Sequence, residues 1–160
     1  MGNPVLRVGA ARLDPLGPRS IASRMRYEDI REAADLANLS PQEAIQTSLK
    51  ASEGNGRAYV VYADETPEVV FGCVGSSAIG VGHPWLLGTD IIAALPVSFA
   101  KLFVRYVKEF QGLFPILTNI MDARNESHLK WLEATGFKFI KDYPDFGPGR
   151  VLAKQFIKVA

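Results

Sequence analysis

The sequence predicts an α/β (α+β) fold, with one central sheet in a single domain. The chain has 160 residues, of which 48% are hydrophobic, and this suits one domain with one sizeable core. Segments with helical periodicity alternate with strand-like segments along the chain. The clearest pair is an apolar stripe at helical spacing over 99–110, followed by a nearly unbroken apolar run over 116–121. Such a run indicates a central strand that is buried on both faces, between the helix before it and the helix after it.

Helices are predicted wherever apolar residues recur at helical spacing. The first covers 30–37. The second begins at Ser40, which is suited to cap the helix because Glu43 completes a capping box. A long helix begins near residue 96 and a short one covers 127–135.

The remaining apolar segments predict strands and the turns between them. We expect 64–67 to form a hairpin turn, 80–84 to break the chain before the apolar run 85–87, and 15–18 to lie in a loop. The predicted strands are a short first strand around Val5, Leu6 and Val8, the hairpin strands 58–62 and 69–76, the central strand 116–121, and two last strands at 137–140 and 151–159.

Charge and composition exclude several classes of protein. With 18 basic and 17 acidic side chains the formal net charge is +1, and no basic stripe is present, so we expect no direct nucleic-acid site. Cys73 is the single cysteine, which excludes an internal disulfide. His83 and His128 are the only histidines, and they do not have the sequence spacing of metal ligands, so we expect no metal site. No apolar stretch suits a membrane span or a secretory signal, and no membrane association is expected.

The order of elements resembles that of the GCN5-related N-acetyltransferases (GNAT). Asn125, followed a helix later by Gly136-Phe137, is similar to that family's segment from a capping Asn to a Gly-Phe pair. The resemblance implies a GNAT-like single domain, whose central mixed, mostly antiparallel sheet carries helices on both faces. We assign this domain to 24–160, and 1–23 to an N-terminal arm or first strand.

A narrower resemblance points to the internal virion protein A family of short-tailed bacteriophages. The resembling segments are 25–32, 71–74, 84–90, 117–125 and 131–132. This resemblance implies a non-catalytic virion structural or assembly protein, located in the virion and in the host cytoplasm during assembly. Its expected partners are other virion proteins of the portal, tail or capsid interior, and a homo-oligomer is also open. The alternative is an active acyl-CoA-dependent N-acetyltransferase, and fold alone does not decide between the two.

The GNAT resemblance also implies where acetyl-CoA would bind, and the corresponding residues are poorly suited to it. The family holds the pyrophosphate on a Gly-rich turn at the start of the central helix, whereas 88–98 lacks that pattern. Pro96 has no N–H to offer and Asp90 brings negative charge. Lys101 and Arg105 suit a solvated helix face. We therefore expect no cofactor and no useful binding of acetyl-CoA.

The family's proton donor is also missing. The resemblance places a Tyr where this chain has Leu132, and neither Leu132 nor the adjacent Trp131 is an acid. A partly exposed helix histidine is favoured over an acid–base role for His128. We therefore expect no catalytic residue. The weak cofactor-binding candidates are Asn119, which the resemblance places near the splayed strands, and Asn125.

Interaction residues are predicted on the N-terminal arm and in one apolar run. Arg7, Arg12 and Arg19 are spaced along an arm rich in Gly and Pro, and Arg is favoured at interfaces. A simple first strand is the alternative for part of this arm. Trp85 is expected to be a core residue or an interface anchor.

Overall fold

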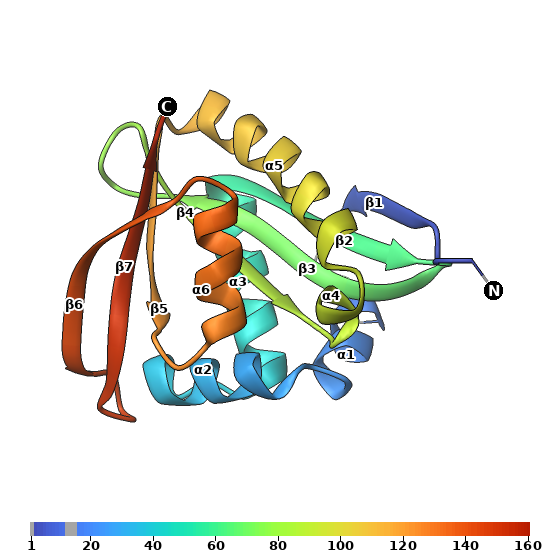
Figure 1. Ribbon diagram of the computed structural model, residues 1–160, viewed down its shortest axis with the longest axis horizontal. Coiled ribbons are helices and arrows are strands. Elements are labelled where there is room, and N and C mark those ends of the chain that lie inside the picture. Colours follow the sequence, from blue (N-terminus) through green and yellow to red (C-terminus); the bar gives the residue numbers. More distant parts are fainter. Residues whose placement is uncertain (1, 12–15) are drawn as a thin grey trace.

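A computed structural model, which describes residues 2–11 and 16–160, shows one seven-stranded sheet in the order β1-β2-β3-β4-β5-β7-β6 (Figure 1). Neighbouring strands are antiparallel except for the parallel pair β4–β5. The predicted mixed, mostly antiparallel sheet is thereby confirmed. The strands are β1 (Leu6–Ala10), β2 (Gly56–Ala63), β3 (Thr66–Gly75), β4 (Val81–Gly88), β5 (Ile116–Asp122), β6 (Lys138–Phe146) and β7 (Val151–Val159).

Helices cover both faces of the sheet, as predicted (Figure 1). The helices are α1 (Leu16–Ser23), α2 (Tyr27–Ala37), α3 (Pro41–Gly54), α4 (Ile91–Ala94), α5 (Pro96–Leu113) and α6 (Glu126–Ala134). α5 and α6 pack on one face around a core rich in Phe, while α1 and α3 pack on the other. Within the described residues, no helix is both long and apolar enough to cross a membrane.

Strand β3 shows why a central strand of this sheet is apolar on both sides. Val69 and Phe71 belong to the core beneath α5, whereas Val70 between them belongs to the core with Ile21 and Ile45 on the other face. Because successive side chains of a strand point to opposite faces, a strand covered twice has no polar side.

Local signals in the sequence form the expected structures. The Ser40 side chain accepts a hydrogen bond from the Glu43 N–H at 3.2 Å, and the Glu43 carboxylate accepts one from the Ser40 N–H, which completes the capping box of α3. After α6, Gly136 has a φ of +94°, the left-handed conformation that ends helices. Asp64 and Glu65 have positive φ and form the tight turn of the β2–β3 hairpin, so Thr66 already belongs to β3.

Two sequence predictions require correction. Helix α1 begins at Leu16, inside the predicted loop 15–18, of which Pro15 lies outside the described residues. Pro18 falls in the first turn of α1, where a missing N–H breaks no helical hydrogen bond. Strand β4 begins at Val81, where a chain break was predicted, and it contains Pro84. β4 tolerates this proline because β5 has already diverged from it.

The central position of β5 can be tested by truncating its most buried side chain. Replacing Leu117, which is 0% exposed, with Ala is expected to lower the free energy of unfolding by about 2–5 kcal/mol, because a cavity is left behind. Urea denaturation followed by circular dichroism measures this. In the control Ile140→Ala, the side chain is 55% exposed on β6, and a change below about 0.5 kcal/mol is expected. Equal effects of the two substitutions would contradict the placement of β5.

Candidate active site

The central feature of the molecule is a gap in the sheet between β4 and β5. The two strands pair only at Val81–Ile116 and Gly82–Leu117, and then separate toward their C-terminal ends (Figure 1). In the antiparallel pairing of β4 with β3, alternate residues turn their main-chain groups toward the gap. Pro84, Leu86 and Gly88 are the residues that do so beyond the separation. An extended polar ligand can pair with such a free strand edge.

A buried clamp holds the far end of β4 away from β5. The Gly88 N–H donates to the Asp29 carboxylate at 3.0 Å, and the Gly88 carbonyl accepts from the Arg26 N–H at 2.9 Å. The guanidinium of Arg26 pairs with Asp29 at 2.9 Å, and the two residues are only 7% and 1% exposed. The end of β4 therefore bonds to the start of α2 in place of β5, which keeps the gap open.

Asn119 closes the other end of the gap. Its amide nitrogen donates to the Pro84 carbonyl at 2.9 Å, and its amide oxygen accepts from the Ile120 N–H at 2.8 Å. This side chain joins β5 to β4 just where their main chains stop pairing. Asn119, a weak cofactor-binding candidate from the sequence, therefore acts as a staple between the splayed strands.

Three cavities surround the gap, and two residues line all of them. The α5 cavity has a volume of about 50 Å³, the α4 cavity about 120 Å³ and the α2 cavity about 250 Å³. The α5 and α4 cavities lie on the face of α5 and α6, and the α2 cavity lies on the face of α2 and α3. Leu86 of β4 and His128 of α6 border each one. Leu86 and His128 therefore lie where the cavities of the two faces border one another, and this place is called the junction.

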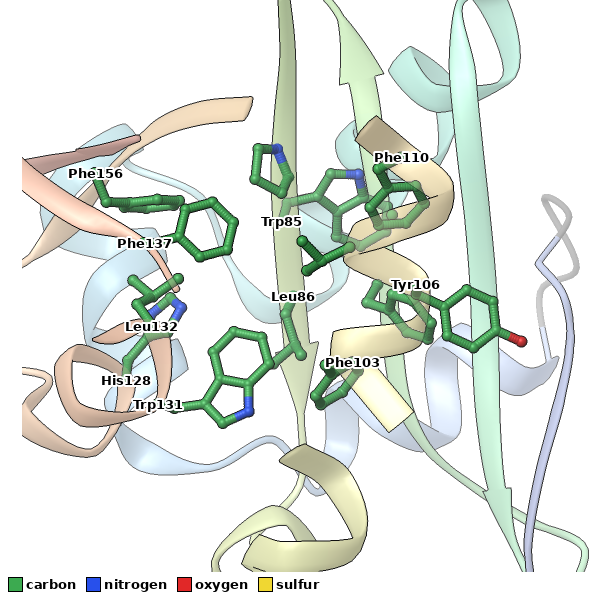
Figure 2. A pocket seen from close by; sticks show the side chains of 14 residues that line it. Trp85, Leu86, Phe103, Tyr106, Phe110, His128, Trp131, Leu132, Phe137 and Phe156 are labelled. Atoms are coloured by element: carbon green, nitrogen blue, oxygen red, sulfur yellow. The ribbon is translucent and has the colours of Figure 1, made fainter. Parts of the chain in front are cut away.

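The α5 cavity is closed by aromatic side chains. Figure 2 shows Phe103 of α5 and Trp131 of α6 on either side of the strand that carries Leu86. Their rings meet edge to face, with centroids 4.9 Å apart. Leu132 is 2% exposed and lines the same cavity, so the predicted Tyr position is a core position in this chain.

The α4 cavity collects polar groups that have no partner. It is lined by Arg26, Leu86, Ile92, Ala93, Pro96, Phe103, Ser127, His128 and Trp131. Arg26 Nε, His128 Nδ1 and Trp131 Nε1 are buried and make no hydrogen bond within the described part of the chain. Buried polar groups are normally paired, so three unpaired groups among the residues that line one cavity mark this part of the fold as a candidate site.

His128 is a neutral side chain at the junction of the cavities. Burial, and then the nearby charge of Arg26, lower the pKa of His128 to about 3. The imidazole is therefore uncharged at neutral pH, and it can form a hydrogen bond but cannot serve as a protonated acid. The predicted partly exposed helix histidine is half-buried, with Nδ1 fully buried.

The α2 cavity contains an acidic side chain that sequence reasoning missed. One carboxylate oxygen of Glu32 accepts a hydrogen bond from the Asp122 N–H at 2.7 Å. Burial is the main cause that raises the pKa of Glu32 to about 8, and the negative charges of Asp29 and Asp122 add to it. No local pattern distinguishes Glu32 from other acidic helix residues, because its partner is 90 residues away.

The other predicted residues lie apart from this site or support it. Asn125 caps α6, where its side-chain oxygen accepts from the His128 N–H at 3.3 Å, while its buried Nδ2 has no partner within the described residues. Trp85 is half-buried and donates from Nε1 to the Ser52 hydroxyl at 3.0 Å.

The predicted arginines are placed in three different ways. Arg7 lies on β1, where it pairs with Glu65 at 3.2 Å and covers the Tyr62 ring. Arg19 is exposed on α1. Arg12 lies outside the described residues. Over 2–11 and 16–160, no group of three or more His, Cys, Asp or Glu side chains suited to a metal ion is found.

Solved structures that this chain resembles are acetyltransferases. A GNAT-family acetyltransferase from Streptococcus pneumoniae has a TM-score of 0.70 and 11% identity, covering 98% of this chain and 100% of its own. A GCN5-related N-acetyltransferase from Kribbella flavida has a TM-score of 0.72 and 15% identity, covering 97% and 98%. An acetyltransferase from Bacillus subtilis, solved in complex with CoA, has a TM-score of 0.68 and 10% identity, covering 98% and 99%.

These likenesses show that the chain has a GNAT-like fold. No protein-family model matches the sequence, and neither does any curated protein.

The expectation of a non-catalytic virion protein is wrong. The similar structures named above are acetyltransferases that match nearly the whole chain, and nothing in the comparisons indicates the internal virion protein A family. The sequence suggested that family because short segments such as 84–90 and 117–125 resemble it. In the structure these segments form the edges of the gap, which is a feature of the fold itself.

The clamp is expected to make a large contribution to stability. Replacing Arg26 with Met would leave the carboxylate of Asp29 buried without its counter-charge, which lowers the free energy of unfolding by about 3–5 kcal/mol. The control Arg24→Met removes a more exposed pair with Glu68 and should cost about 1 kcal/mol or less. Thermal and urea unfolding measure both. Similar small losses would show that the clamp does not hold β4 in place.

Proposed function

We propose that this chain is an acyl-CoA-dependent N-acyltransferase. The observation that carries the proposal is the set of unpaired buried atoms of Arg26, His128 and Trp131 on the α4 cavity, beside the open edge of β4. A polar molecule that enters there reaches the junction between Leu86 and His128, and through it the other face of the sheet. The GNAT-like fold and the CoA complex of one similar structure support the choice of ligand.

The donor groups around the α4 cavity fit a pantetheine arm followed by phosphates. The free main-chain groups of Leu86 suit the amides of pantetheine. The Arg26 side chain and the hydroxyl of Ser127, which lie 3.5 Å apart, suit an anion. At the start of α5, the N–H groups of Val97 and Ser98 have no main-chain acceptor within the described residues. A helix N-terminus of this kind favours phosphate.

This proposal reverses the sequence-based expectation that acetyl-CoA does not bind. Pro96 is the first residue of α5, so it removes only one of the N–H groups that a helix start offers. Asp90 is exposed, where solvent and salt screen its charge. The Gly-rich turn is still absent, and we propose that Arg26 and Ser127 compensate for it.

The residues divide the chemistry between the two faces of the sheet. A bound acyl-CoA supplies an acyl group activated as a thioester. Neutral His128 offers a hydrogen bond at the junction, while Phe103 and Trp131 exclude water from it. Glu32, on the far side of the junction, is the acidic group able to take a proton from an amine.

Two neighbouring alanines of α4 allow a matched test of the α4 cavity. Ala93 lines the cavity and Ala94 does not, although both are exposed. A carboxylate at the cavity mouth repels phosphate, so Ala93→Glu is expected to weaken acetyl-CoA binding by about tenfold or more, while Ala94→Glu changes it little. Isothermal titration calorimetry with acetyl-CoA measures binding, and the melting temperature checks folding.

Catalysis is then followed by thiol release from acetyl-CoA in the presence of a panel of amines. Failure of the wild-type chain to bind acetyl-CoA at millimolar ligand, or equal binding by the two variants, would disprove the proposal.

A further inference from the structure

We propose that the α2 cavity is the acceptor site for a small primary amine with an apolar body, and that Glu32 binds and deprotonates its ammonium group. This inference rests on the proposed acyl transfer and names the substrate class of that reaction. The cavity lies on the opposite face of the sheet from the α4 cavity and shares Leu86 and His128 with it. An acceptor in the α2 cavity therefore approaches the junction from the side that the acyl donor leaves free.

The position of Glu32 suits an ammonium group. The Asp122 N–H holds one carboxylate oxygen at 2.7 Å, which fixes the side chain from the β5 side. Within the described residues, no protein donor is bonded to the other oxygen, and it is not among the fully buried polar atoms. The carboxylate thus has one oxygen anchored and one available to a ligand in the cavity.

The rest of the α2 cavity suits a hydrocarbon body. Its wall includes Leu36 and Leu39 from the α2 side, Leu87 and Trp85 from β4, and Phe156 from β7. Asn119 also lines the cavity, but both ends of its amide are already bonded to Pro84 and Ile120. A sugar or a polyamine would leave polar groups unpaired against such a wall, which costs affinity.

The charged groups around Glu32 leave one negative charge in the cavity for a ligand to balance. Asp29 is paired with Arg26, and Asp122 is paired with Arg124 at 2.6 Å. His128, which faces the same cavity, is neutral because its pKa is lowered to about 3. Glu32 is therefore the acidic group of the cavity whose charge is not already balanced. Burial, which raises its pKa to about 8, also makes it a stronger base than an ordinary carboxylate.

The acid–base chemistry follows from this arrangement. Glu32 takes one proton from the bound ammonium group, which leaves the free amine. The amine nitrogen forms a C–N bond to the acyl carbon as the C–S bond of the thioester breaks. The second proton of the nitrogen moves to the departing sulfur, so the products are an amide and a free thiol. Glu32 returns its proton to solvent.

Binding of 2-phenylethylamine to the full chain without acyl-CoA tests the site directly. Calorimetry is expected to show saturable binding by the wild type and by Glu28→Gln. Glu28 lies one turn earlier on α2 and does not line the cavity. Above about pH 8, where Glu32 is ionised, Glu32→Gln keeps the acceptor for the Asp122 N–H but removes the charge, and should weaken binding by about tenfold or more. In the complete reaction, this variant should lose about 10²–10⁴-fold in kcat/KM.

A second pair of variants tests the apolar wall without altering Glu32. Ala33 lines the cavity, whereas Ala34 is exposed and does not. Ala33→Leu is expected to weaken the binding of 2-phenylethylamine by about tenfold and to leave the turnover of methylamine nearly unchanged. Only the larger amine would collide with the added leucine side chain. Ala34→Leu should affect neither amine.

The pH dependence gives an independent readout. Glu32 must be ionised to accept a proton, and its pKa is raised, so activity is present above about pH 8 and lost as pH falls below it. The kcat/KM of the wild type for 2-phenylethylamine should rise about tenfold per pH unit below pH 8 and then level off. The residual activity of Glu32→Gln should lack this rise.

The outcomes separate this inference from the proposed function. Binding of 2-phenylethylamine that depends on Glu32, without any binding of acetyl-CoA, would support the amine site and disprove the acyltransferase. Acetyl-CoA turnover that prefers spermidine or a lysine peptide, or that is equal in Glu32→Gln and Glu28→Gln, would support the acyltransferase and overturn the inference.

Discussion

The buried ion pair between Arg26 and Asp29 is the interaction on which the rest of this structure depends. It places a carboxylate and a main-chain N–H opposite the two main-chain groups of Gly88, so the end of β4 finds its hydrogen bonds on α2. Without that substitute, these groups would be satisfied only by pairing with β5. Gly88 suits this position because a Cβ there would come within 3.0 Å of a Val69 methyl group. Where β4 separates from β5, the main-chain groups of Gly88 thus keep their hydrogen bonds, because the start of α2 replaces β5 as their partner.

The gap between β4 and β5 explains the shifted pKa values of the side chains around it. Polar groups that would otherwise face a neighbouring strand or water are enclosed by α2, α5 and α6. Arg26 keeps its charge because Asp29 is beside it, and the same charge helps to keep His128 neutral. Burial and the nearby carboxylates of Asp29 and Asp122 raise the pKa of Glu32, so its proton is held more tightly. One clamp therefore sets both the shape of the site and the ionisation of its neighbours.

The residues expected to matter and the residues that form the site overlap only in part. Asn119 was identified because the resemblance places it near the splayed strands, and Asn125 because it matches the family's capping Asn. In the structure Asn119 joins β5 to β4, and Asn125 caps α6. Arg26 directly precedes α2 and Glu32 lies on it, and the sequence of this helix resembles any charged amphipathic helix. Their partners are Ser127, 101 residues away, and Asp122, 90 residues away, and no local pattern reports such pairs.

The sequence by itself determined the features that depend on interactions between residues close together along the chain. The capping box at Ser40, the apolar stripe of α5, the apolar run of β5 and the terminating Gly136 each depend on residues within a few positions of one another. These signals were sufficient for the α/β class with one central sheet, whereas the mixed sheet and the helices on both faces followed from the resemblance to the GCN5-related N-acetyltransferases. Only the tertiary structure decided that β4 and β5 separate, that Pro84 is compatible with a strand, and that Glu32 meets His128 at one cavity. Those facts depend on hydrogen bonds and burial between distant segments, which become defined only when the chain has packed.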